Sequence, residues 1–328
     1  MKKMFIQFII GITIGSVLFS CGPKLNSGSY KGSVNTTGYQ ADTLALPYAT
    51  KSVQNFSKVT GWKNGLTPTA PAGFTVTKFA DGLNHPRWLY VAPDGDIFVA
   101  EANTELKGIK KIGAKISRKI KTQHYGKSAN QILRFTDADH DGIPEKSSVF
   151  IEGLNQPFGM LVLGNHFYVA NTDGLMEYDY HPKDTAITTP GKQILSLPGN
   201  GRHWTKNIIS NSKGDKIYVA VGSSSNVAED GLDKEIRRAD ILEINTDGSG
   251  EKIYASGLRN PVGMDWAPGT QTLWTAVNER DELGDELVPD YLTSVKEGGF
   301  YGWPYSYYGQ HYDPRMSKTP GVELVKKA

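Results

Sequence analysis

The chain has 328 residues, with 36 basic and 34 acidic side chains and a formal net charge of +2. Because a dedicated polyanion binder needs a large basic excess, this balance excludes nucleic acid as the main partner. The 36 Gly, 17 Pro and 16 Tyr residues favour many short strands joined by tight turns over an ordinary α/β fold. The single cysteine excludes a disulfide framework.

The N-terminus has the pattern of a secretory signal. Two lysines follow Met1, and the apolar run over residues 5–19 is shorter than the ~20 residues of a transmembrane helix. The run ends in Leu18-Phe19-Ser20-Cys21, which resembles the lipobox of bacterial lipoproteins. We therefore predict a signal peptide over residues 1–20, with Cys21 as the lipidated first residue of a mature chain in the bacterial cell envelope, facing the periplasm or on the outer-membrane surface. The alternative is a signal peptide whose cysteine has no role.

Residues 21–72 are rich in Ser, Thr, Gly, Asn and Pro, and their apolar residues are too scattered to define a helix or strand face. This composition predicts a tether that holds a lipid-anchored domain away from the membrane. Part of residues 44–62 could pack onto that domain, and an ordered N-terminal strand is the alternative there. The folded domain is then predicted over residues 73–328.

From Gly73 onward one pattern recurs. It consists of a Gly-Leu or Asn-Pro opening, an apolar strand, a turn with Gly, and a second strand that ends in Val-Ala or a close variant. The four copies begin at residues 82, 153, 203 and 257, and further β-rich segments lie at 131–135 and 240–244. Alternating strands and Gly turns with no helical period between them predict an all-β fold, a β-propeller in which each unit is one blade.

The length of the predicted domain sets the expected number of blades. At about 50 residues per blade, residues 73–328 give about five. The last ten residues, Thr319–Ala328, have no closing-blade pattern. Because a propeller has to close to protect its sheet edges, we expect the ring to be incomplete at the C-terminus.

Four short motifs in the second half of the chain carry a resemblance to a known family. They are GRHW at 201–204, ASGLRNP at 255–261, NERDELGDE at 278–286 and GGFYGWP at 298–304. Together they resemble the soluble aldose and sorbosone dehydrogenases, over about residues 73–315. The resemblance implies a six-bladed propeller of the quinoprotein type that binds pyrroloquinoline quinone (PQQ) beside a calcium ion at the mouth of its central channel.

His203 is the candidate general base. Oxidation of a sugar hydroxyl by hydride transfer needs a group that takes the hydroxyl proton, and imidazole, with an ordinary pKa near ~6.5, suits this task at neutral pH. His203 follows a Gly-Asn-Gly turn at the rim of a predicted strand, where the resemblance places the catalytic histidine.

Arg259 and Asn260 open the fourth copy of the repeat. The resemblance assigns both residues, together with Arg202, to PQQ. A fixed guanidinium such as Arg259 would have a catalytic effect by stabilising negative charge that develops on a quinone oxygen. The alternative for this pair is an arginine salt-bridged between blades and an asparagine in a turn. The functional reading requires His203 and Arg259, 56 positions apart, to share one cavity.

The acidic segment at 278–286 is a candidate calcium site. Its carboxylates offer hard oxygen ligands, and we select Asp281, Asp285 and Glu286. The resemblance implies that the equivalent loop binds the ion that polarises the quinone, a Lewis-acid role. A solvated acidic loop is the alternative.

A second acidic stretch, with Asp137, Asp139, Asp141 and Gly142, spells the start of a calcium loop. It is incomplete as an EF-hand, because Ser148 stands at the twelfth position, where a bidentate carboxylate is required. A separate structural calcium site and an Asp-rich hairpin turn both remain open.

Two functions are consistent with these patterns. The first is PQQ-dependent oxidation of an aldose or a sorbosone-like sugar aldehyde, with an acceptor protein or a quinone receiving the electrons. Activity should be poor if the 328 residues are the complete polypeptide. The second is a non-enzymatic propeller that binds carbohydrate or protein, because the resemblance places further PQQ-binding basic residues in the blades expected to be missing. A calcium-dependent propeller hydrolase is disfavoured, because the acidic residues form no ring of metal ligands with one from each blade.

Overall fold

The structure is a computed structural model that describes residues 44–63, 65–106, 112, 122–123 and 125–328. The predicted signal peptide, Cys21 and the first part of the predicted tether lie outside the described residues. Within the described part of the chain, no helix has the length and hydropathy of a membrane span.

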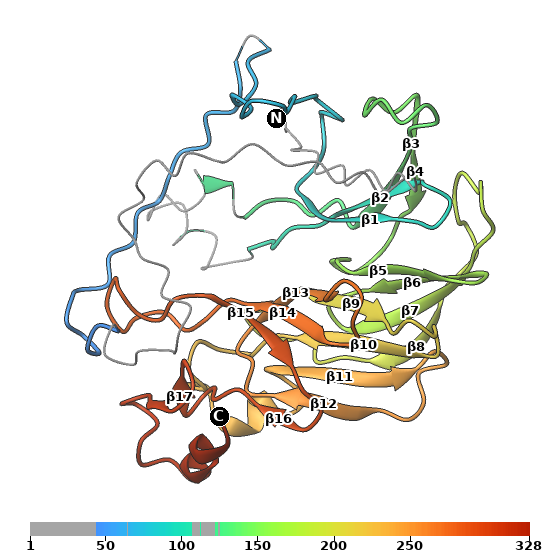
Figure 1. Cartoon of the computed structure of the whole chain (residues 1–328). Helices are drawn as coiled ribbons and strands as arrows, with labels where there is room; N and C mark the ends of the chain where they lie inside the picture. Colours follow the sequence, from blue (N-terminus) through green and yellow to red (C-terminus); the bar gives the residue numbers. More distant parts are fainter. Residues whose placement is uncertain (1–43, 64, 107–111, 113–121, 124) are drawn as a thin grey trace, which may run out of the picture.

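Four sheets follow one another along the chain (Figure 1). The first contains β1 (Pro86–Val91), β2 (Ile97–Glu101), β3 (Gln131–Thr136) and β4 (Lys146–Ile151). The second contains β5 (Met160–Leu163), β6 (His166–Ala170), β7 (Gly174–Asp179) and β8 (Lys192–Ser196). The third contains β9 (Lys206–Ser210), β10 (Lys216–Val221), β11 (Asp240–Asn245) and β12 (Lys252–Ser256), and the fourth contains β13 (Pro261–Trp266), β14 (Leu273–Val277) and β15 (Tyr291–Val295).

The arrangement of these sheets is that of a propeller. Within each sheet, strands that are consecutive in sequence pair antiparallel. The first strands of successive sheets, β1, β5, β9 and β13, contact one another in that order. The first strand of each blade therefore lies on the inside, as a propeller requires. Each predicted repeat copy forms the first hairpin of one sheet.

The expected number of blades was too high, since the described residues form four blades, apart from one separate two-stranded sheet, where the length predicted about five. After β15, the chain adds β16 (Gly299–Phe300) parallel to β12 and forms the short pair β17 (Ser306–Tyr307) and β18 (His311–Tyr312). The remaining regular elements are two 3-10 helices, η3 (Leu232–Glu235) and η4 (Val322–Lys327). An average length per blade overcounts here because long irregular connections use residues that build no sheet.

The Gly-Leu openings of the repeat have a clear physical basis. They are Gly82-Leu83, Gly153-Leu154 and Gly257-Leu258. The three glycines have φ values of 72°, 73° and 75°, a left-handed conformation that glycine adopts without a steric penalty. The three leucines are buried, so each opening turns the chain and anchors it before the inner strand begins.

The core lies between adjacent sheets. Alternate residues of β10 face opposite neighbours: Ile217, Val219 and Val221 pack toward the second sheet, whereas Tyr218 and Ala220 pack toward the fourth. A strand that is buried on both faces has a continuous apolar sequence rather than an alternating one. This explains why the second strand of each copy ends in a run such as Tyr-Val-Ala.

The N-terminal segment packs on the acidic loop of the fourth sheet. No strand is assigned to its described residues, 44–63 and 65–72, so the ordered-strand alternative does not hold there. The Tyr48 N–H donates to the Leu283 carbonyl at 2.6 Å, and the Val53 N–H donates to Asp285 Oδ1 at 2.8 Å. This part of the predicted tether therefore contacts the propeller directly.

Candidate functional site

The entries of the four sheets surround one open cavity of about 1650 Å³. The residues that follow the repeat proline, Arg87, Phe158 and Val262, all lie in its wall. His203 and Arg259 lie in the same wall, from the third and fourth sheet entries. Since inner strands begin at the same end of a propeller, their entry loops bring residues from distant parts of the chain together.

The hydrogen bonds of His203 assign its tautomer. Its Nδ1 lies 2.9 Å from the Ser223 carbonyl oxygen and 2.9 Å from Ser223 Oγ. The Ser223 hydroxyl donates its own proton to the Ser225 carbonyl at 2.6 Å. Because a carbonyl only accepts and this hydroxyl proton is engaged, Nδ1 carries the ring proton. Nε2 is therefore the nitrogen that can accept a proton.

The surroundings of His203 keep the imidazole neutral. Burial and the nearby charges of Arg259, Lys206 and Arg202 lower its pKa to about 4, although the bond to the Ser223 carbonyl opposes this shift. At pH 7 the ring is unprotonated at Nε2. This is the form that a general base needs before it takes a proton.

Arg259 is a buried node that joins the third and fourth sheets. Its Nε donates to the Asn226 carbonyl at 3.0 Å, and Nη2 donates to Asn226 Oδ1 at 2.8 Å. Its Nη1 donates to the carbonyls of Asn278, at 3.1 Å, and Glu279. The remaining Nη2 proton goes to Asp281 Oδ2 at 3.2 Å. All five guanidinium N–H groups thus have acceptors. Three of these bonds are buried, whereas the bond to the Asn278 carbonyl is part-buried and the Asp281 carboxylate belongs to an exposed side chain.

Asn260 and His203 depend on the small size of Gly222. The Asn260 side chain is buried in the cavity wall, and its Oδ1 has no hydrogen-bond partner among the described residues. A Cβ on Gly222 would overlap Asn260 Oδ1 and lie 2.6 Å from His203 Cβ. A glycine is required here because the two side chains occupy the space of a methyl group.

We predict that Gly222→Ala destabilises the fold by about 1–3 kcal/mol, the usual cost of overpacking, and displaces His203. Urea unfolding measures the loss. Gly263→Ala is the matched control, because its Cβ would meet Ala276 Cβ at an ordinary 3.7 Å. Equal stability of the two variants would contradict the argument.

Aromatic rings and one cation form another side of the cavity. The Arg87 guanidinium lies 5.1 Å from the centroid of the Trp204 ring. Phe158 contacts both Trp88 and Trp204, with ring centroids 5.3 and 6.3 Å apart. Arg87 forms no ion pair with any described carboxylate. Sequence reasoning missed Arg87, although its place directly after the repeat proline could have identified it.

Lys206 is a buried lysine that binds the backbone of the GRHW motif at 201–204. Its side chain is fully buried, and Nζ donates to the carbonyls of His203 at 3.4 Å and Trp204 at 3.2 Å. Burial, with the charge of Arg238, lowers the Lys206 pKa to about 7, whereas Asp173 opposes the shift. No sequence pattern indicates this role, because a lysine at the start of a strand usually faces solvent.

Comparison with known proteins identifies the family. The TrAA12-like family model matches residues 68–292, which is more than half of the chain. The chain belongs to the TrAA12-like family.

Two curated relatives match over part of their length. An uncharacterised protein of Borreliella burgdorferi is 27% identical over 251 residues, covering 73% of this chain and 57% of that protein. Aldose sugar dehydrogenase YliI of Escherichia coli is 30% identical over 143 residues, covering 40% of this chain and 36% of that enzyme. The chain thus spans little more than half of the first relative and about a third of the second.

Solved structures share the fold. The holo form of the pyranose dehydrogenase PQQ domain from Coprinopsis cinerea superposes with a TM-score of 0.53 at 18% identity, covering 71% of this chain and 57% of that one. The PQQ-bound aldose sugar dehydrogenase from Streptomyces coelicolor gives 0.50 at 19% identity, covering 72% and 68%. These likenesses support a propeller of the kind found in PQQ enzymes.

The other predicted site residues of this TrAA12-like chain have different surroundings. Arg202 is exposed at the cavity rim and pairs with Glu229 at 3.0 Å. Asp281 pairs with Arg259. Asp285 binds the N-terminal segment twice: its N–H donates to Thr50 Oγ1, and its Oδ1 accepts the Val53 N–H. Asp281, Asp285 and Glu286 line a smaller cavity of about 380 Å³.

Metal-binding geometry occurs elsewhere. Across the described residues, one group of three carboxylates has ligand oxygens within 4.8 Å of one another, and it consists of Asp137, Asp139 and Glu145. The three acidic residues selected on the 278–286 loop do not form such a group.

Proposed function

We propose that the chain carries the site of a PQQ-dependent sugar dehydrogenase that oxidises an aldose or a sorbosone-like sugar aldehyde. The observation that carries this proposal is a neutral histidine, with Nε2 free to accept a proton, in the wall of a large cavity shared with Arg259. Membership of the TrAA12-like family and the likeness to PQQ-bound propellers support it.

The cavity residues fit a flat, polyanionic cofactor. Arg87 offers a cation with no described carboxylate partner, and the indole of Trp204 offers an aromatic face beside it. The buried Asn260 amide oxygen lacks a hydrogen-bond donor in the described structure, which suits a ligand that supplies one. When bound, PQQ would supply the hydride acceptor. We propose that Arg202, Arg259 and Asn260 hold it.

The remaining chemistry belongs to the chain itself. His203 Nε2 accepts the proton of the hydroxyl on the sugar carbon that loses the hydride; in a sugar aldehyde this carbon is the hydrated carbonyl carbon. The Ser223 carbonyl holds the protonated ring in place through Nδ1. Arg259 can donate to a ligand once its bond to the exposed Asp281 carboxylate opens, because its other four N–H groups stay bound to acceptors of Asn226, Asn278 and Glu279. We also propose that a calcium ion binds at Asp281, Asp285 and Glu286. The proposal further includes a propeller that closes with six blades.

Reconstitution tests the proposal. Purified protein is mixed with PQQ and calcium, quinone binding is followed by absorbance, and dye reduction is measured with a panel of aldoses and sugar aldehydes. Stoichiometric binding and sugar-dependent dye reduction are expected. If the folded chain binds no quinone, the alternative of a propeller that binds carbohydrate or protein gains support.

The low pKa of His203 predicts a pH profile. The proton-accepting form dominates above about pH 4, so kcat/KM should stay flat from about pH 5.5 to 7.5 rather than fall below an ordinary pKa of 6.5. Between about pH 4 and 6.5, His203 is protonated in the unfolded chain but neutral in the folded protein. Lowering the pH through this range therefore also destabilises the fold. Circular dichroism at each pH separates unfolding from loss of activity, and an acid limb centred near pH 6.5 in folded protein would contradict this assignment.

We also propose that Cys21 is lipidated and anchors the protein in the cell envelope. Cys21→Ser is expected to move the protein from the membrane fraction to the soluble fraction of cells that express the full chain. Fractionation and mass spectrometry of the N-terminal peptide measure the change. An unmodified Cys21 in the membrane-bound wild type would contradict the proposal.

A further inference from the structure

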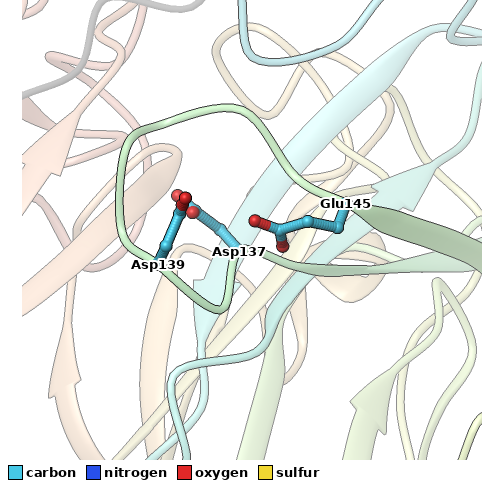
Figure 2. A group of neighbouring side chains, drawn as sticks. All are labelled: Asp137, Asp139 and Glu145. Atoms are coloured by element: carbon cyan, nitrogen blue, oxygen red, sulfur yellow. The ribbon is translucent and has the colours of Figure 1, made fainter.

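The loop between β3 and β4 carries an acidic group that the proposed sugar site does not use. It extends from Asp137 to Glu145, and none of its residues lines the large cavity. Asp137, Asp139 and Glu145 each place a carboxylate oxygen within 4.8 Å of the other two. Figure 2 shows the carboxylates of Asp137 and Asp139 side by side, with that of Glu145 extending toward them from the far side of the loop.

Asp137 is the buried member of the group. Its side chain is only 8% exposed, and one oxygen, Oδ2, accepts the Gly142 N–H at 2.9 Å. The other oxygen, Oδ1, has no hydrogen-bond partner among the described residues. A buried carboxylate oxygen without a donor costs free energy, so it indicates a positively charged partner.

The backbone holds the carboxylates in this arrangement. The Ala138 N–H donates to Glu145 Oε2 at 2.9 Å, and the Glu145 N–H donates to the Thr136 carbonyl at 3.0 Å. Gly142 turns the loop with a φ of 86°. None of the three carboxylates forms a salt bridge with a described basic side chain. Three carboxyl groups are thus held close together with no described basic partner.

We propose that Asp137, Asp139 and Glu145 bind a calcium ion that stabilises the outer hairpin of the first blade. Three carboxylates are hard oxygen ligands, which disfavours zinc, a metal that prefers nitrogen and sulfur. An irregular loop with one buried and two exposed carboxylates suits calcium, which accepts six to eight oxygens in flexible geometry, better than magnesium, which requires a near-ideal octahedron. Water or loop carbonyls complete the coordination.

This ligand set differs from the one that the sequence indicated. Asp141 is absent from the group, and its Oδ1 accepts the Ile143 N–H at 2.7 Å. Glu145, four residues further on, takes its place. The site is therefore a hairpin loop with its own spacing rather than a shortened EF-hand.

The pair of variants Asp139→Asn/Glu145→Gln and Asp141→Asn tests the proposal in the full chain without PQQ. Both alter exposed carboxylates of the same loop, and only the first removes ligands. Isothermal titration of metal-free protein with CaCl₂ should give a Kd at least tenfold weaker for Asp139→Asn/Glu145→Gln than for wild type. Asp141→Asn should bind like wild type. Calcium at 1 mM should raise Tm by several degrees in the wild type and Asp141→Asn only.

Titration of Asp285→Asn/Glu286→Gln distinguishes this site from the calcium proposed beside the quinone. That variant should retain the hairpin site, so failure of the dehydrogenase proposal leaves the result intact. Wild-type protein that binds no calcium would overturn the inference. Equal calcium affinity and equal Tm shifts in Asp139→Asn/Glu145→Gln and wild type would also overturn it, because the ion would then lie elsewhere.

Discussion

Replacement of His203 by Asn is expected to lower kcat for sugar oxidation by about 100- to 10,000-fold, the usual contribution of a positioned general base. Asparagine can place its amide N–H near the position of Nδ1, so the bond to the Ser223 carbonyl survives. The proton acceptor at Nε2 is lost. PQQ affinity and Tm should therefore stay close to those of the wild type while turnover falls.

A second histidine provides the control. His166 lies on β6, outside the cavity wall, with its Nδ1 3.1 Å from Glu177. His166→Asn should leave turnover unchanged. Steady-state dye reduction at saturating sugar and PQQ measures both variants. A His203→Asn enzyme with kcat within threefold of the wild type would show that another group takes the proton, and the proposed mechanism would fail.

The repeat was the part of the fold that the sequence predicted best. Three of the four copies open with a glycine in the left-handed conformation, such as Gly153, followed by a buried leucine and an apolar strand. Such signals are local, and a propeller places equivalent local units at equivalent places around one axis. The candidate residues of the entry loops, His203, Arg259 and Asn260, therefore lie in one cavity wall although the sequence separates them.

The contacts within the site could not be predicted in the same way. Arg259 binds acceptors from the loop at Asn226 and from the segment that follows β14, and no spacing in the sequence encodes such a junction. Asp141 fitted a calcium-loop pattern better than Glu145, yet the turn at Gly142 directs the Asp141 carboxylate to the backbone. The predicted number of blades was wrong for a related reason, because chain length and composition do not distinguish a sheet from a long irregular connection.

Arg259→Lys is predicted to destabilise the protein by about 1–3 kcal/mol, although it preserves the charge. Lysine offers three N–H donors from a single point, whereas the five acceptors around Arg259 match a planar fork. The Asn226 carbonyl and Oδ1 would keep the Trp303 Nε1–H and the Asp281 N–H as donors. The loss therefore falls mainly on the buried Glu279 carbonyl, and an unsatisfied buried carbonyl costs about 1–3 kcal/mol. Urea unfolding monitored by tryptophan fluorescence measures the loss.

Asp281→Asn is the matched variant in the same network, because it removes the negative charge of the exposed Asp281 carboxylate and leaves the other four acceptors of Arg259 unchanged. A pair with one partner 78% exposed contributes little, so the loss should stay below about 1 kcal/mol. If both variants lose the same small free energy of unfolding, the buried hydrogen bonds of Arg259 do not contribute to stability, and Arg259 is available to bind a ligand. If Arg259→Lys alone is strongly destabilised, the arginine first joins two blades, and only its Asp281-facing donor remains for a cofactor.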